Sequence, residues 1–238
     1  MERLVTWART WLGLHISPAQ ADAFRRYLQT LQTWNQRFNL TAIREPEAIL
    51  AKHFLDSLSV LTVTGCLDGQ RVVDVGAGAG FPGLPLKILC PAMRLTVVES
   101  VAKKAAFCRH VADTLALDGV TVLAERAESV GRQAAHREAY DWALARAVAR
   151  LPILAEYLLP LVRLGGAMVA QKGETAAAEA QEAHGSLALL GGALEKIHPL
   201  TLPGIAETRY LVLVRKVAAT PPRYPRRPGI PSKRPLGV

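Results

Sequence analysis

Along the first 61 residues the apolar side chains recur every three or four positions, as is typical of amphipathic helices. After a short helical pattern in residues 3–14, a long helix is predicted to begin behind Ser17. Serine caps a helix, Pro18 suits the first helical position, and Gln20 completes a capping box. A second helix follows Pro46. We expect residues 1–69 to form a helical subdomain. The apolar stripe of its first main helix is Phe24, Leu28, Leu31, Trp34 and Phe38, and that of its second is Leu50, Phe54, Leu58 and Leu61.

From residue 70 onward, short apolar runs alternate with amphipathic helices, which indicates parallel strands with helical crossovers. Two later runs are joined by a Pro203-Gly204 turn and predict an antiparallel pair that closes the sheet. We therefore expect an α/β fold with a seven-stranded, mostly parallel sheet in residues 70–217. The predicted strands are 72–75, 94–99, 120–123, 141–146, 167–171, 194–202 and 209–217, and the predicted helices are 84–90, 103–115, 150–164 and 174–190.

A glycine-rich turn follows the first of these strands. Glycine reaches backbone dihedrals that other residues avoid, and it lets a ligand approach the main chain. Glu99 ends the next strand, 25 positions beyond Asp74. This distance is one βαβ step, and an acid there can accept both ribose hydroxyls of a nucleoside. The turn reads VVDVGAGAGFPGLP and contains Gly76, Gly78, Gly80 and Gly83.

Two cofactors fit this spacing. The last three glycines match the dinucleotide fingerprint, which requires a helix to open at Gly83 with its amides facing a pyrophosphate. However, Pro82 and Pro85 flank Gly83, and the Asp74 carboxylate would repel a pyrophosphate but attract the sulfonium and amino groups of S-adenosylmethionine. We favour S-adenosylmethionine. A nicotinamide dinucleotide, or a turn that binds nothing, are the alternatives.

The ends of the later strands carry further candidates. Glu128, after Ala127, could meet an adenine amino group or only open a helix. The fourth strand ends in ALARAV, without the acidic or Asn-Pro-Pro-aromatic tetrad of enzymes that methylate exocyclic amines. Its Arg146 could also be a structural ion-pair partner. Cys90-Pro91 has the wrong order and position for the thiolate nucleophile of pyrimidine-carbon methylation. Guanine N7 carries a free lone pair, so its methylation needs no general base, and we assign none.

The net charge of +9 falls almost entirely on the last thirty residues. Residues 209–238 hold eight Lys/Arg and no acid, whereas the rest of the chain contributes +1. Residues 218–238 are rich in proline, which predicts an extended basic arm without regular secondary structure that contacts a polyanion. A solvated tail without a partner is the alternative.

Other features exclude some classes of protein. No apolar run reaches the roughly 18 residues of a membrane span, and the charged start MERLVTWARTW does not resemble a signal peptide. We expect a cytoplasmic monomer. The three cysteines, Cys66, Cys90 and Cys108, lack Cys-x-x-Cys spacing, so the sequence indicates neither a disulfide framework nor a zinc site, and we expect no metal.

Several stretches together resemble the glucose-inhibited division protein B methyltransferases, which methylate guanine N7 in small-subunit ribosomal RNA. The resemblance implies a Rossmann-like class I methyltransferase with an added amino-terminal helical part. This sequence differs from the common family pattern at Glu99, where the family usually has Asp, and at Ala145, where it usually has Ser. The matching stretches are NLTAI from Asn39, HFLDSL from His53, DVGAGAGFPGLPL, Glu99 with Lys103-Lys104, RAE at 126–128, ARAVA from Ala145, Lys172-Gly173 and YPRRPGIP.

The resemblance also assigns residues. Gly76, Phe81, Ala127, Glu128 and Arg146 match cofactor-contacting positions, and the loop argument adds Gly78, Gly80 and Glu99. The candidates for guiding the RNA are Asn39, His53, Lys172 and Arg223. His53 could instead be a helix-surface imidazole bonded to Asp56 or Ser57, and Lys172 a free surface lysine. An NAD-dependent oxidoreductase, or a ribosome-assembly factor with a vestigial donor pocket, are the alternative functions.

Overall fold

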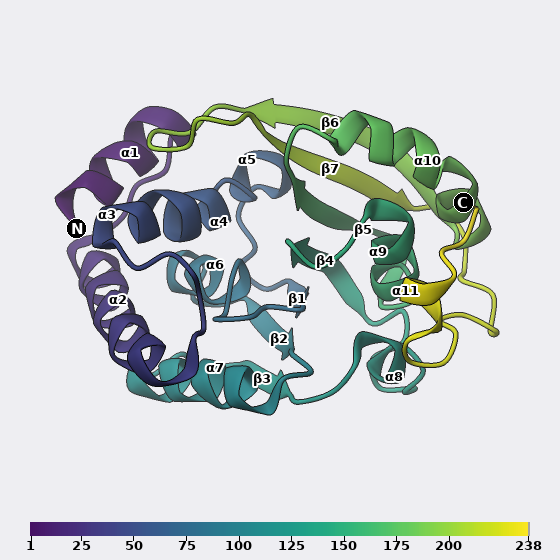
Figure 1. Ribbon diagram of the computed structural model, residues 1–238, viewed down its shortest axis with the longest axis horizontal. Coiled ribbons are helices and arrows are strands. Elements are labelled where there is room, and N and C mark those ends of the chain that lie inside the picture. Colours follow the sequence, from purple (N-terminus) through teal and green to yellow (C-terminus); the bar gives the residue numbers. More distant parts are fainter. Residues whose placement is uncertain (238) are drawn as a thin grey trace.

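The computed structural model describes residues 1–237 and contains one seven-stranded sheet in the order β3-β2-β1-β4-β5-β7-β6. The first five strands run parallel, and β7 lies antiparallel between β5 and β6. The predicted seven-stranded, mostly parallel sheet is therefore confirmed (Figure 1). The strands are β1 Arg71–Val75, β2 Arg94–Val98, β3 Val120–Leu123, β4 Tyr140–Arg146, β5 Val162–Lys172, β6 Gly192–Leu200 and β7 Arg209–Lys216.

Helices cover both faces of the sheet because the buried strands point successive side chains to opposite sides. Val72 of β1 enters one hydrophobic cluster and Val73 the other. The first cluster contains side chains of the amino-terminal helices, α6 (Gly83–Leu89) and α7 (Ala102–Thr114). The second contains side chains of α8 (Ala127–Val130), α9 (Leu151–Leu158) and α10 (Ala176–Leu189).

The amino-terminal helices begin where the sequence predicts. The Ser17 amide donates to Gln20 Oε1 at 2.9 Å and the Gln20 amide to Ser17 Oγ at 3.3 Å, which is the predicted capping box. The second helix starts at Pro46 but contains a π-helical turn. These helices share one core with β1, β2 and α6, and the division of the chain at residue 69 stays a prediction. Their bounds are α1 Glu2–Leu12, α2 Pro18–Phe38, α3 Pro46–Ile49, the π-helical turn Leu50–Leu55, α4 Asp56–Leu58 and α5 Leu61–Thr64.

One predicted helix boundary is wrong. The helix expected over 150–164 ends at Leu158, and β5 begins at Val162, five residues earlier than the predicted strand. Pro160 follows the helix end and cannot supply an amide to continue it. Val162 instead pairs with Tyr140 before an irregularity in the β4–β5 ladder.

The carboxyl-terminal segment is packed onto the protein and is not an extended arm. Arg137 donates to the Thr220 and Tyr224 carbonyls, both at 2.7 Å, and Arg132 donates to the Pro225 carbonyl at 2.8 Å. Guanidinium groups thus satisfy carbonyls that proline-rich backbone leaves without a ladder partner. The Tyr224 ring is buried in the second cluster. The segment also forms the short helix α11 (Ile230–Lys233) beside α9, so the prediction of no regular structure is wrong there (Figure 1). Val238 lies outside the described residues.

An ion pair anchors this segment to α9. The Glu156 side chain is 1 % exposed, and it accepts hydrogen bonds from the Arg226 backbone amide and guanidinium at 2.6–3.1 Å. These bonds raise the pKa of Arg226 above its usual value.

No helix in residues 1–237 is long and apolar enough to cross a membrane.

Replacing Arg226 by Gln removes the guanidinium and leaves the Glu156 carboxylate buried without its ion-pair partner. We expect the free energy of unfolding to fall by about 3 kcal/mol, as when one partner of a buried pair is lost. Chemical denaturation measures this change. Arg227→Gln, at the next and exposed position, is the matched control and should cost less than about 0.5 kcal/mol. Equal losses in both variants would contradict the anchoring role of the pair.

Candidate active site

A cleft opens at the carboxyl ends of β1, β4 and β5, where the strand order reverses between β1 and β4. Ligands of open α/β sheets bind at such a switch point. The cleft consists of two cavities, of about 430 Å³ and about 70 Å³, that share Gly76. The larger cavity extends to the π-helical turn and β5, and the smaller one lies beside α8.

The glycine-rich turn forms the wall between the cavities. Gly76, Gly78 and Gly80 all have positive φ angles, 70°, 59° and 89°. A Cβ atom on Gly76 would lie 2.6 Å from Val148, and one on Gly80 would lie 2.6 Å from the Tyr27 hydroxyl. At Gly78 a Cβ atom would meet nothing within 4 Å, so this residue faces open space in the larger cavity. Gly80 is buried and does not line either cavity, so it permits close packing behind the turn.

Two buried carboxylates hold the turn from beneath. Asp74 Oδ2 accepts the Gly83 amide at 2.8 Å, and Glu99 Oε2 accepts the Gly78 amide at 2.9 Å. The second Glu99 oxygen accepts the Val101 amide at 2.8 Å. Each Glu99 oxygen keeps one lone pair for a further donor. Neither carboxylate lines either cavity, so the prediction that Asp74 lies beside the sulfonium is not what the structure shows, and Glu99 adjoins the cleft through the Gly78 amide that it holds.

The contact between Asp74 and Gly83 bears on the choice of cofactor. Helix α6 does open at Gly83, as a dinucleotide site requires, but Asp74 already binds the amide of that residue. Burial raises the pKa of Asp74 to about 7, and the bond from Gly83 and the Arg146 charge act in the opposite direction. A buried acid at this helix start is unfavourable for a pyrophosphate.

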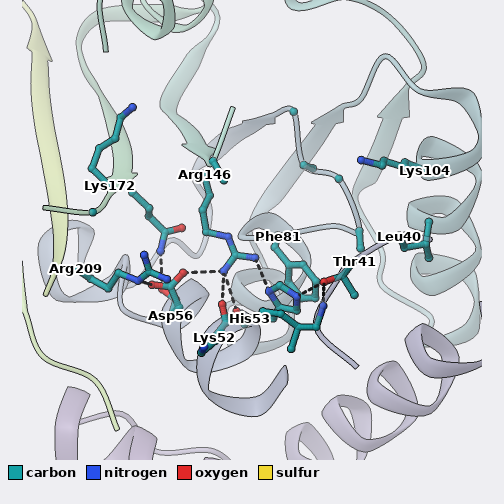
Figure 2. A pocket seen from close by; sticks show the side chains of 18 residues that line it. Leu40, Thr41, Lys52, His53, Asp56, Phe81, Lys104, Arg146, Lys172 and Arg209 are labelled. Carbon is teal, nitrogen blue, oxygen red and sulfur yellow. Dashed lines mark hydrogen bonds and ion pairs between the residues drawn. The ribbon is translucent and has the colours of Figure 1, made fainter. Parts of the chain in front are cut away.

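Arg146 ends β4 and reaches across to the π-helical turn (Figure 2). Its Nη1 donates to the Lys52 carbonyl at 3.1 Å and to Asp56 Oδ2 at 2.8 Å. Its Cζ lies 5.0 Å from the centre of the Phe81 ring. Arg146 therefore lines the larger cavity and is also the ion-pair partner of a buried carboxylate, so both predicted roles are compatible.

His53 lies in the same cavity wall. Its ring stacks on Phe81 with centroids 4.6 Å apart, Nε2 is 2.8 Å from Thr41 Oγ1, and Nδ1 is 3.3 Å from Arg146 Nη2. A guanidinium only donates, so Nδ1 accepts and the proton sits on Nε2. Burial and the Arg146 charge lower the pKa of His53 to about 3, so the ring is neutral near pH 7. The alternative interpretation, a helix-surface imidazole bonded to Asp56 or Ser57, is wrong, because the ring contacts Thr41 and Arg146.

The other predicted residues divide into two groups. Lys172 lines the larger cavity, but its ammonium donates to the Ala149 carbonyl at 2.5 Å and pairs with Glu179 at 2.7 Å, so it is not a free surface lysine. Asn39 is an exposed carboxyl-terminal cap of α2 with a positive φ and does not line the cleft. Arg223 is exposed, and its Cζ lies 5.1 Å from the centre of the Tyr224 ring, away from both cavities.

Ala127 and Glu128 line the smaller cavity at the start of α8. Glu128 is 2 % exposed, and its Oε1 accepts the Gly229 amide of the carboxyl-terminal segment at 2.8 Å. The other carboxylate oxygen of Glu128, Oε2, accepts no hydrogen bond from the described residues. The segment that was predicted to contact RNA thus also positions a predicted cofactor residue.

Comparisons with known proteins agree with this geometry. Residues 20–206 match the GidB family, described as rRNA small subunit methyltransferase G. The chain belongs to the GidB family. "Ribosomal RNA small subunit methyltransferase G" from Roseiflexus sp. (strain RS-1) is 50% identical over 99% of this chain and 100% of the relative. The protein of that name from Halalkalibacterium halodurans is 46% identical over 94% of both chains.

Solved structures with low sequence identity share the fold. A mutant of a 16S rRNA (adenine(1408)-N(1))-methyltransferase with cosubstrate SAM from Catenulisporales acidiphilia aligns with a TM-score of 0.52 at 14% identity. It covers 65% of this chain and 88% of that chain. TrmN from Thermus thermophilus aligns at 0.53 and 19% identity, over 71% and 53% of the two chains. The predicted GidB resemblance and the S-adenosylmethionine-dependent enzyme class are confirmed by the family match.

Two residues of this GidB cleft were missed in the sequence. Arg209, the first residue of β7, lies 3.7 Å from Asp56 Oδ1, and Gln171 of β5 donates to the Asp56 carbonyl at 2.6 Å. Both line the larger cavity. Gln171 directly precedes Lys172 at the end of the predicted fifth strand, and this position alone could have predicted that Gln171 lies at the cleft. The pairing of β7 beside β5 brings Arg209 to the cleft, and no local motif predicts that placement.

The lowered pKa of His53 predicts a pH-dependent stability difference. In the unfolded chain His53 takes up a proton near its usual pKa of about 6.5, whereas in the folded protein it does so near 3. Between these values the unfolded state binds more protons, so the His53 contribution to stability falls as the pH falls. We expect the wild type to lose stability relative to His53→Gln between pH 7 and pH 4. Denaturation across that range measures it, with His184→Gln, an exposed site, as the control. A difference that does not change with pH would contradict the buried neutral ring.

Proposed function

We propose that this protein transfers a methyl group from S-adenosylmethionine to N7 of a guanine in small-subunit (16S) ribosomal RNA. The GidB match and the curated relatives, which are named for the small-subunit RNA, support the reaction class and the RNA. The choice of N7 rests on the side chains of the cleft. We also propose that the protein acts as a monomer in the cytoplasm, with residues 1–69, 70–217 and 218–238 as its three parts.

The residues of the cleft fit the cofactor. Open space beside Gly78 leaves room for a ligand against the main chain, and Glu99 below it can accept further hydrogen bonds. We assign the larger cavity around Gly76 and Phe81 to the methionine part and the smaller one beside Ala127 and Glu128 to the adenine. The cofactor supplies an electrophilic methyl group on a positively charged sulfur. The contact of Asp74 with Gly83 gives no support to the NAD alternative.

The observation that carries the N7 assignment is the lack of an available base among the described side chains of the larger cavity. Asp56 is the one carboxylate among them, and it pairs with Arg146 and lies near Arg209. His53 is neutral, and its low pKa makes it a weak base at pH 7. Methylation of an exocyclic amine must release a proton, whereas a ring nitrogen with a free lone pair attacks without losing one, and the family resemblance selects guanine N7 among such nitrogens. Alignment is then the main task of the chain's own residues.

Half of the cations in residues 209–238 are available to a polyanion. Four of the eight have ion-pair partners within the protein, namely Arg209, Arg215, Lys216 and Arg226. Within the described part of the chain no ion pair is formed by Arg223, Arg227, Lys233 or Arg234, which are all exposed. We assign phosphate contacts to these four residues. Asn39, His53 and Lys172 remain candidates for guiding the RNA, with His53 and Lys172 acting from the cavity wall.

Gly78→Asp should abolish methylation, because an aspartate side chain would fill the open space beside the turn. Aspartate tolerates a positive φ better than most residues, so we expect the fold to remain. Gly13→Asp is the matched control, since Gly13 is exposed, has a φ of 67° and also meets nothing within 4 Å. Mass spectrometry of rRNA from a deletion strain that expresses each variant measures 7-methylguanine.

We expect the modification to be absent in the deletion strain and with Gly78→Asp, and present with Gly13→Asp. If every 7-methylguanine of the small-subunit RNA persisted in the deletion strain, the N7 assignment would be wrong. If Gly78→Asp restored full methylation, the cofactor assignment to this cavity would be wrong.

Replacing Arg223, Arg227, Lys233 and Arg234 together by Gln should weaken RNA binding most at low salt. Each neutralised phosphate contributes roughly 0.7–0.9 to the slope of log K against log salt, so we expect the slope to fall by about 3. Point substitutions are preferable to truncation because Tyr224 and Arg226 are packed into the fold. Arg9→Gln, on the exposed side of α1, is the control. Equal salt slopes for the wild type and the fourfold variant would remove the segment from the RNA interface.

A further inference from the structure

Cys66 and Cys90 lie together although 24 positions separate them. Cys66 lies in the linker that precedes β1, and Cys90 lies at the end of α6. Their Sγ atoms are 3.9 Å apart. The sequence indicated neither a disulfide nor a zinc site, because their spacing matches no motif. The fold supplies the proximity that the spacing does not.

Asp68 adds a third potential ligand. Its Oδ2 is 3.5 Å from Cys66 Sγ, and the ligand atoms of Cys66, Asp68 and Cys90 all lie within 4.8 Å of one another. A tetrahedral zinc ion with bonds to sulfur of about 2.3 Å holds two sulfurs about 3.8 Å apart, and a sulfur and an oxygen about 3.5 Å apart. Two of the observed separations therefore match the edges of a zinc tetrahedron closely, and the third, between Asp68 and Cys90, is no longer than 4.8 Å.

Neighbouring groups orient these ligands. The Ala92 amide donates to Asp68 Oδ1 at 2.7 Å, which leaves Oδ2 for the ion, and the Leu67 amide donates to Cys90 Sγ at 3.5 Å. Such outer contacts are typical of built metal sites. The ammonium of Lys87, a buried residue, is held nearby by the Pro91 and Met93 carbonyls. One cation beside two thiolates and a carboxylate offsets the excess negative charge that would remain with a divalent ion.

A cavity of about 210 Å³ gives access to the two thiols, and exposed His15 also lines it. Cys66 itself is exposed. An ion can therefore reach the ligands from solvent without opening the core, and a water molecule from this cavity can take a fourth position.

We propose that Cys66, Asp68 and Cys90 bind a zinc ion that fastens the linker before β1 to the end of α6. Thiolates select a soft divalent metal, and the tetrahedral edges favour zinc. On binding, each thiol exchanges its proton for a bond to the metal, and the two protons pass to solvent. The proposed zinc site lies at one end of α6, and Gly83, whose amide Asp74 holds beneath the glycine-rich turn, lies at the other. Because the site is at the far end of this helix from the cleft, we assign it a structural role.

The test measures zinc in the full-length protein purified under reducing conditions, incubated with zinc and passed through gel filtration. We expect one zinc ion per chain by elemental mass spectrometry in the wild type. Cys66→Ser should lose it, and Asp68→Asn should bind it at least about tenfold more weakly. Cys108→Ser, a cysteine buried elsewhere, is the matched control and should keep it. Cobalt substitution should give thiolate charge-transfer absorption and tetrahedral visible bands in the wild type and in Cys108→Ser alone.

Chelation gives a second measurement that does not depend on a mutant that folds. Removal of zinc should lower the melting temperature of the wild type and leave that of Cys66→Ser unchanged, since only the former has an ion to lose. Less than a tenth of a zinc ion per chain in the wild type would overturn the proposal. A Cys66–Cys90 disulfide in the reduced preparation, or the same zinc content in Cys66→Ser, would also overturn it.

Discussion

The guanidinium of Arg146 is the contact with the most partners among those that join the amino-terminal helices to the sheet at the cleft. A guanidinium has five donors and must find acceptors when it is buried. The π-helical turn supplies the Lys52 and His53 carbonyls, and Asp56 supplies a carboxylate. If either side moved away, a charge would be left buried without its partner. The helices are therefore held where His53 and Asp56 line the cavity, which links the stability of the fold to the shape of the site.

Charge is arranged across the cleft in two layers. Below the glycine-rich turn lies the Glu99 carboxylate, which accepts the Gly78 amide and favours a positively charged ligand above it. The walls of the larger cavity carry Lys52, Lys104 and Arg209, which favour a polyanion. This polarity suits a cationic methyl donor on one side and RNA on the other. Burial and the neighbouring Arg146 charge keep His53 neutral in this wall.

The sequence predicted the sheet and the first helices well because those signals are local. The Ser17 capping box and the strand at 120–123 depend on neighbouring residues, and both are found as predicted. The residues of the glycine-rich turn were also identified, but the directions of their side chains were not. Asp74 points beneath the turn, and Arg209 reaches the cleft from the last strand of the fold. Such placements depend on tertiary pairing, which no short motif encodes.

The carboxyl-terminal segment illustrates why a run of charge does not by itself define a surface. Among its cations, Arg226 holds the segment down through the buried Glu156, whereas Arg227 beside it is exposed. The anchored backbone then delivers the Gly229 amide to Glu128 in the smaller cavity. A segment that was free in solution could present the same charges to RNA, but it could not position Glu128. Docking therefore places exposed cations and a wall residue of the cleft on one anchored stretch of chain, which fixes where these cations lie relative to the glycine-rich turn.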